Sequence, residues 1–227
     1  KPLHSYIWRY ALILIAVGLA LLPVAWMATM AFKPHTEWVT SASDLHWWPH
    51  QETWGNFEYI FTGQTEAVTV SHERTAGKPI LASLVTSLLG TLIAVVAGTL
   101  GAYAVSRFKV GGNLPLGVLQ LRLFPPLAVM IPVMIMWAFL GAMDTWWGLS
   151  LIYGIVTLPF AFWLMKTFFD EVPREIEEAA LVEGCSWFRV FWKVTLPMVK
   201  AALASTALFV FILNWSDYVI ALLLTRK

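Results

Sequence analysis

The sequence predicts an all-α integral membrane protein. Hydrophobic residues make up 59% of the 227 residues and charged residues only 13%, and the mean hydropathy is +0.69, far more apolar than a soluble domain. Several apolar runs reach the roughly 20 residues that a helix needs to cross a bilayer. A polar passage at 170–197 lies between two of these runs. We therefore predict one transmembrane domain over residues 1–227.

Several other classes of protein are excluded. The net charge of +1 is spread over loops and forms no basic face, so nucleic acid is not an expected partner. The single Cys185 excludes an internal disulfide, and the histidines lack metal-ligand spacing, so we expect no metal site. The sequence contains no phosphate-binding G-x-x-x-x-G-K-[ST], H-E-x-x-H or G-x-S-x-G motif. We therefore expect no enzymatic activity in this chain itself.

The apolar runs define five membrane spans and the loops between them. We place the spans at about residues 11–32, 80–104, 114–140, 149–169 and 201–224. Small residues crowd the second span, which predicts close packing against other helices. Residues 33–79 form an outer loop, with a short amphipathic helix at 56–61. The tryptophans of the loop 33–79 suit interfacial anchoring or contact with a partner subunit better than stacking on sugars.

The third run contains a charge and three prolines. Arg122 is followed by Phe124-Pro125-Pro126 and then by Pro132. A charge inside an apolar run is costly and faces a cavity or a partner, and the prolines predict a kinked helix. Arg122 either tethers the carbonyls of neighbouring helices or contacts a transported solute. The residues leave both interpretations open.

The fifth span contains a polar cluster. It consists of Asn214, Trp215, Ser216, Asp217 and Tyr218. The cluster either lines the outer part of a translocation pathway or forms hydrogen bonds to a partner helix. These two interpretations carry equal weight.

The polar passage at 170–197 predicts a helix, a turn and a second helix at the membrane surface. Pro173 suits the start of a helix, and glutamates in its first turn meet the positive end of the helix dipole. Gly184 is placed to end this helix. A second helical stretch follows from Trp187 to Val194, with one apolar face. The small residues stay bare, which suits docking by another protein.

The same passage resembles a known family. Glu178-Ala179-Ala180, three residues, Gly184, nine residues and then Val194-Thr195-Leu196-Pro197 resembles the EAA loop of permease subunits in ATP-binding-cassette importers. Glu183 stands where Asp is usual, and Val194 where Ile is usual. The resemblance implies that the loop couples the permease to a cytoplasmic ATPase. The residues implied in this coupling are Glu178, Ala179, Ala180, Gly184, Leu196 and Pro197.

The resemblance also implies a fold, a set of partners and a location. The family has a type I importer permease fold with six spans, so we expect five here with the sixth missing from a fragment of a longer product. Expected partners are a second homologous permease, two ATPase subunits that bind ATP and Mg²⁺, an extracytoplasmic solute-binding protein and the lipid bilayer. This chain itself would bind no cofactor. The location would be a bacterial or archaeal cytoplasmic (inner) membrane, with a cytoplasmic N-terminus.

The same resemblance favours a carbohydrate importer of the maltose and glycerol-phosphate type. The Arg-Leu-Phe-Pro-Pro segment from Arg122 and the Asn-Trp-Ser-Asp-Tyr segment from Asn214 are similar to that subgroup, which implies a sugar or polyol substrate. One alternative is the same importer class carrying an amino acid, phosphate or a phosphorylated polyol. A more distant one is an ion-coupled transporter that uses Arg122 and Asp217, which needs more intramembrane carboxylates than this sequence has. A purely structural subunit leaves the spacing of the loop unexplained.

Overall fold

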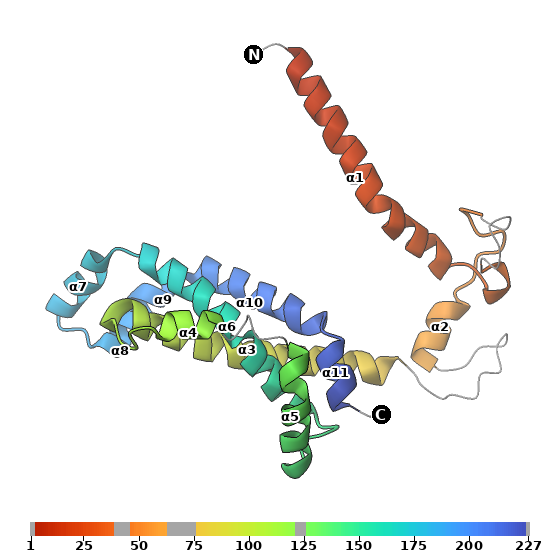
Figure 1. Ribbon diagram of the computed structural model, residues 1–227. Helices are drawn as coiled ribbons and strands as arrows, with labels where there is room; N and C mark the ends of the chain where they lie inside the picture. Colours follow the sequence, from red (N-terminus) through yellow and green to blue (C-terminus); the bar gives the residue numbers. More distant parts are fainter. Residues whose placement is uncertain (1–2, 39–45, 63–75, 121–125, 226–227) are drawn as a thin grey trace. The chain divides into compact units, whose positions relative to one another are not determined.

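The computed structural model describes residues 3–38, 46–62, 76–120 and 126–225, and every regular element in these ranges is helical (Figure 1). The predicted all-α class is therefore confirmed. Two compact units, residues 1–80 and 81–227, are described separately below. Arg122 lies outside the described residues.

The first unit contains one long apolar helix and a short outer segment. Helix α1 spans Leu3–Ala31, with Pro23 inside it, and is followed by the 3-10 turn η1 (His35–Glu37) and by α2 (Gly55–Thr62). Helix α2 confirms the short helix expected at 56–61. Its Asn56 side chain donates to the carbonyls of Ala31 and Lys33 at 2.9 and 2.7 Å. Asn56 therefore satisfies backbone carbonyls at the carboxyl end of α1, which would otherwise lack partners.

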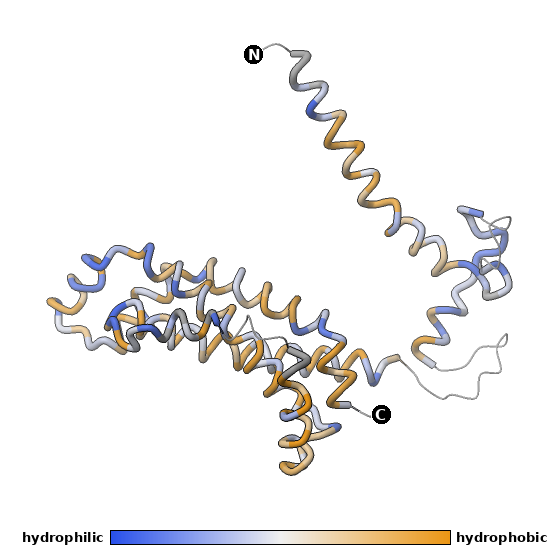
Figure 2. The backbone as a smooth tube through the Cα atoms, viewed as in Figure 1, coloured by the Kyte–Doolittle hydropathy of each residue, from blue (hydrophilic) through white to orange (hydrophobic). Residues whose placement is uncertain are grey.

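The second unit is built from three long helical segments and several short ones. Its elements are α3 (Gly77–Phe108), α4 (Leu114–Gln120), α5 (Pro126–Phe139), α6 (Trp146–Glu171), α7 (Arg174–Val182), α8 (Trp187–Val190), the π-helical turn η3 (Phe191–Thr195), α9 (Leu196–Met198), α10 (Lys200–Trp215) and α11 (Val219–Leu224). Apolar residues dominate α3, α5, α6 and α10, whereas hydrophilic residues gather over α7 (Figure 2).

Small residues bring α3 and α6 together. A Cβ atom at Gly98 would lie 2.8 Å from Ala161 Cβ and 2.8 Å from the backbone nitrogen of Phe162. A Cβ atom at Gly90 would lie 2.6 Å from Tyr153 Cβ. The two backbones can approach this closely only because glycine has no side chain. Helix α10 packs along α6, so these three helices form the core of the unit.

The division of the predicted spans differs from the sequence expectation. Three helices of the described chain are long and apolar enough to cross a membrane, namely Trp8–Ala31, Gly77–Phe108 and Trp146–Glu171. The segments Trp187–Met198 and Lys200–Trp215 add a fourth if their 77° bend lies within one span. The third predicted span, 114–140, contains the separate helices α4 and α5 with the undescribed residues 121–125 between them.

The fifth predicted span is also divided. Instead of one helix over 201–224, α10 ends at Trp215 and α11 begins at Val219. The physical reason lies in Asp217, whose carboxylate accepts a hydrogen bond from the Ile220 backbone N–H at 2.8 Å. An aspartate that accepts from a backbone N–H three positions later favours the start of a new helix.

Candidate functional site

The polar passage forms the predicted helix and turn. Helix α7 follows Pro173, whose backbone is non-helical, and has Glu175 and Glu177 in its first turn. Gly184 adopts a φ of +93° and donates its N–H to the Leu181 carbonyl at 3.0 Å. This left-handed conformation is the one that glycine adopts without strain and that commonly ends a helix. The signals read from the sequence therefore produce α7 as expected.

One face of α7 is open to solvent. Glu178, Ala179 and Gly184 are exposed, and Ala180 is half-buried. A Cβ atom added at Gly184 would meet nothing of this chain within 4 Å. Val182, at the end of the helix, is 89% exposed although it is apolar. The small residues and the glutamate of the loop thus lie together on a bare surface.

The opposite face of α7 is anchored by a buried glutamate. The Glu177 carboxylate pairs with Arg107 at the end of α3, with 2.6 Å between Oε2 and Nε and side chains only 2% and 3% exposed. Its other oxygen, Oε1, accepts a hydrogen bond from the Thr195 hydroxyl at 2.6 Å. Both carboxylate oxygens therefore have a partner, as a buried charge requires.

Arg107 also donates to the end of α6 and to its own neighbour on α3. Its Nη2 donates to the Val172 carbonyl at 3.1 Å, and its Nη1 donates to the Ser106 hydroxyl at 3.1 Å. That hydroxyl in turn donates to Asp170 at 2.6 Å. We call the set Ser106, Arg107, Asp170, Glu177 and Thr195 the buried junction. It joins the ends of α3 and α6 to α7 and to the π-helical turn.

Aromatic side chains pack beside the buried junction. The Tyr103 ring of α3 lies 5.5 Å from the Phe169 ring and 4.8 Å from the Phe191 ring, measured between centroids. One turn further, Phe108 contacts Trp187 at 4.9 Å in an edge-to-face arrangement. Such pairs add stability beyond the area that they bury. The end of α3 is thus held to the loop by ionic, polar and aromatic contacts.

A family comparison decides what kind of protein carries this site. Residues 90–227 match the family described as binding-protein-dependent transport system inner membrane component. The chain belongs to this family. The matched region includes α7 and the whole buried junction, so both are parts of a transport permease.

Individual relatives of the permease have names that concern sugars. This chain is 33% identical to the trehalose transport system permease protein SugB of Mycobacterium tuberculosis over 93% of its own length and 73% of that protein. It is 35% identical to the maltodextrin transport system permease protein MdxG of Bacillus subtilis over 64% of this chain and 53% of that protein. The predicted family resemblance is therefore confirmed.

A solved structure has the same fold. A chain from a bacterial ABC transporter involved in the import of the acidic polysaccharide alginate matches all of this chain and 77% of its own length, with a TM-score of 0.72 and 23% identity. The predicted type I permease fold is confirmed by this likeness.

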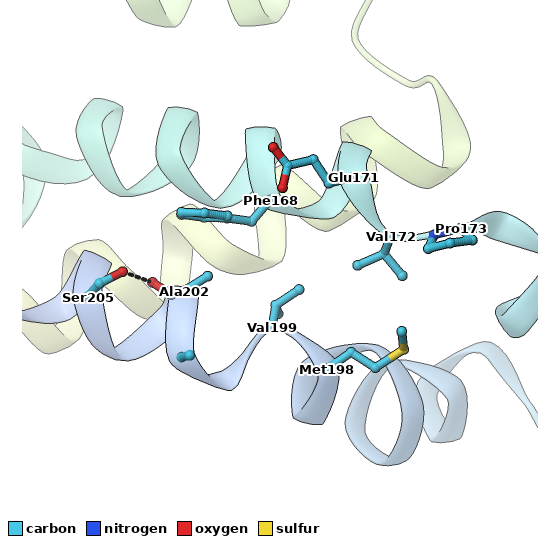
Figure 3. A pocket seen from close by; sticks show the side chains of 9 residues that line it. Phe168, Glu171, Val172, Pro173, Met198, Val199, Ala202 and Ser205 are labelled. Atoms are coloured by element: carbon cyan, nitrogen blue, oxygen red, sulfur yellow. Dashed lines mark hydrogen bonds between the residues drawn. The ribbon is translucent and has the colours of Figure 1, made fainter. Parts of the chain in front are cut away.

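The other loop residues of the permease lie beyond α7. Leu196 is half-buried and packs against the cluster around Tyr103, and Pro197 is exposed in α9. Next to them, a hollow of about 510 Å³ separates the end of α6 from α9 and α10 (Figure 3). Val172 and Val199 point toward each other across it. Its mostly apolar lining offers few groups to a polar ligand.

Of the residues predicted for the pathway, the structure describes Asn214, Trp215, Asp217 and Tyr218, and their side chains differ in their surroundings. Asn214 is buried at 1% exposure, and its side-chain N–H donates to the Thr91 hydroxyl on α3 at 3.2 Å. By contrast, Trp215 and Tyr218 are 45% and 70% exposed. Asp217 is half-buried, and its carboxylate accepts a hydrogen bond from the Ile220 backbone N–H in the first turn of α11. Within the described residues, Asn214 faces a neighbouring helix and the two aromatic side chains face outward.

The buried junction was missed by sequence reasoning. Its central residues are Glu177, in the first turn of α7, and Arg107, in the last turn of α3. The two residues are 70 positions apart, and no local pattern links them. One signal was present in the sequence: Glu177 lies three and four positions before the apolar residues Ala180 and Leu181, a spacing that puts all three on one helix face. In the structure both apolar residues are half-buried.

Proposed function

We propose that this chain is one permease subunit of an ATP-driven importer that moves a sugar or polyol across the cytoplasmic membrane by alternating access. The observation that carries the proposal is the two-sided character of α7. Its inner face is fixed by Glu177, while its outer face presents Glu178, Ala179 and Gly184 to solvent. A short helix built in this way is suited to being pushed by another protein.

The proposal assigns partners to the two sides of the membrane. Two ATPase subunits, which bind ATP and Mg²⁺, dock on α7 from the cytoplasm, and the N-terminus lies on the same side. A second, homologous permease completes the membrane part, and an extracytoplasmic binding protein delivers the solute. Membership of the binding-protein-dependent family supports this assembly. A bacterial or archaeal inner membrane is its expected location.

The substrate class follows from the relatives. Further similar permeases have names that refer to trehalose and maltose in Thermococcus litoralis and to diacetylchitobiose in Streptomyces coelicolor. A sugar or small oligosaccharide is therefore the best-supported solute. Arg122, Trp215, Asp217 and Tyr218 stay proposed contributors to the pathway, whereas the bond to Thr91 gives Asn214 the role of tethering α10 to α3.

Movement would begin at the loop. When the ATPase pair closes on ATP, it pushes α7 as a rigid piece. The push tilts the spans to which α7 is joined and alternates the access of the pathway between the two sides. The chain contributes no hydrolytic chemistry in this scheme. Its part is to convert a displacement at the membrane surface into a rearrangement of helices.

Uptake by the reconstituted complex tests this function. Proteoliposomes that contain both permeases, with ATP inside and ATPase subunits bound, are given labelled trehalose, a maltodextrin, glycerol, an amino acid and phosphate together with the binding protein. We expect ATP-dependent uptake of one of the first three that persists when an ionophore collapses ion gradients. Uptake of only the amino acid or phosphate would overturn the substrate class, and loss of uptake with the ionophore would indicate an ion-coupled transporter.

A further inference from the structure

We propose that the buried Arg107–Glu177 pair is the joint through which displacement of α7 reaches α3. The inference rests on the proposed function, because it concerns how the docked loop moves the membrane helices. Arg107 and Glu177 act as positioning residues, since neither lies on the exposed face that meets the ATPase.

The geometry of the pair makes it stiff. Nε of Arg107 and Oε2 of Glu177 are 2.6 Å apart, and both side chains are almost fully withdrawn from solvent. A buried charge whose partner moves away is left without compensation, at a high cost in free energy. Water cannot readily take the partner's place at such low exposure. The pair therefore resists separation far more strongly than an ion pair on the surface does.

Hydrogen bonds from the π-helical turn, α6 and α7 surround the ion pair. Thr195 holds the second oxygen of Glu177 from the π-helical turn, and Asp170 holds Ser106 from α6. Arg174, the first residue of α7, donates to the Ser106 carbonyl at 2.7 Å. A displacement of α7 must therefore move the ends of α3 and α6 together or break several buried hydrogen bonds.

Helix α3 can carry the displacement into the membrane. It runs without interruption from Gly77 to Phe108, and Arg107 lies in its last turn. Thr91 lies 16 residues before Arg107, about 24 Å along the axis at 1.5 Å per residue, and accepts the hydrogen bond of Asn214. Asn214 precedes the break that separates α10 from α11. The joint thus connects α7 to a continuous helix that contacts the divided span near the middle of its length.

Two measurements on the assembled transporter test the joint. The first is the number of solute molecules imported per ATP hydrolysed. The second is the distribution of distances between nitroxide labels at Ile176 and Leu100, which are 41% and 50% exposed, in a Cys185→Ser background. The test variant is Glu177→Gln, which keeps the shape of the side chain and removes its charge. The matched control is Glu171→Gln, the same change at an exposed glutamate at the end of α6, away from the exposed face of α7.

We expect Glu177→Gln to assemble with the ATPase subunits and still hydrolyse ATP, while importing at least about fivefold less solute per ATP. The label distances should be narrow in the wild type and in Glu171→Gln at every nucleotide state, and broad in Glu177→Gln. Unchanged import per ATP and unchanged label distances in Glu177→Gln would contradict the proposed role of the ion pair.

A second variant guards against misfolding of the first. Thr195→Val removes one hydrogen bond from Glu177 and leaves the ion pair in place. It should give an intermediate loss of import per ATP, and a wild-type ratio would count against the joint. The two proposals fail in different ways. A wild-type complex that binds no ATPase or imports no solute would contradict the proposed function. A wild-type complex that imports solute, together with a Glu177→Gln complex that imports as much solute per ATP, would contradict only the role of the ion pair.

Discussion

Glu177 of α7 and Arg107 of α3 are 70 positions apart in the sequence and form an ion pair of 2.6 Å with both side chains buried. The pair lies directly behind the face that presents Glu178 and Ala179. The short helix α7 therefore has one exposed face and one face held to the end of α3 by a buried ion pair. This combination is what a loop that transmits force requires.

Removing one member of the pair should cost more than removing both. Glu177→Ala leaves the Arg107 guanidinium buried without a counter-charge, so we expect the free energy of unfolding to fall by about 3–5 kcal/mol. The double variant Arg107→Met with Glu177→Leu should recover much of this loss, because it buries apolar groups instead. Denaturant unfolding of the purified protein in detergent measures both values. An equal loss of unfolding free energy in the single and double variants would show that the unpaired Arg107 charge is not what destabilises Glu177→Ala.

Close packing of α3 against α6 should make Gly98 intolerant of larger residues. A Cβ atom there would lie 2.8 Å from Ala161 Cβ, so Gly98→Leu should lower the free energy of unfolding by about 1–3 kcal/mol, as overpacking does. Gly18→Leu is the matched control, because a Cβ atom at Gly18 has nothing within 4 Å. The same unfolding measurement compares them. A larger loss for Gly18→Leu would contradict the packing described here.

The Asn214–Thr91 hydrogen bond should appear as a coupling energy between two helices. We expect a double-mutant cycle with Asn214→Leu and Thr91→Val to give roughly 0.6 kcal/mol, the average for hydrogen bonds between membrane helices, and no more than about 1.7 kcal/mol. Four unfolding curves supply the cycle. Strict additivity of the two substitutions would mean that Asn214 does not tether α10 to α3.

The single Cys185 offers a probe of docking that needs no substitution. It follows Gly184 directly and is half-buried in the free chain. If the ATPase covers this end of α7, the rate of maleimide labelling should fall several-fold in the assembled complex. The measurement is the labelled fraction against time, with the permease pair lacking ATPase as the control. An unchanged rate would place the ATPase elsewhere.

Much of this account follows from local sequence signals, and some of it does not. Pro173, the glutamates of the first turn and Gly184 act within a few residues of one another, so α7 and its end could be predicted. The small residues of the second span predicted its close packing, which Gly98 shows. The Arg107–Glu177 pair joins distant segments, and no local pattern reveals it.

The division of the fifth span at 216–218 also escaped prediction. The run 201–224 is apolar enough to suggest one continuous helix. Its mean hydropathy does not reveal that one carboxylate within it accepts a hydrogen bond from the backbone. Asp217 starts a new helix by accepting from the Ile220 backbone, which is a matter of hydrogen bonding rather than of polarity. For the polar cluster at 214–218, the sequence left a pathway lining and hydrogen bonds to a partner helix equally open. The bond from Asn214 to Thr91 is of the second kind, and the pathway role of the other residues stays a prediction.

The most direct test of the central claim is binding-protein-stimulated ATP hydrolysis by the reconstituted complex with Gly184→Trp or Glu178→Lys. Glu178 and Gly184 are both exposed, and a Cβ atom at Gly184 would have nothing within 4 Å. Because the φ of Gly184 is +93°, its substitution also strains the backbone, so Glu178→Lys is the cleaner variant of the two. We expect both variants to insert into the membrane normally and to lose stimulated hydrolysis and import, because the ATPase no longer seats on the loop. Glu171→Lys, the same charge change on an exposed residue at the end of α6, should retain them. Wild-type hydrolysis and import in both loop variants would show that 170–197 is only a connector, and would contradict the account.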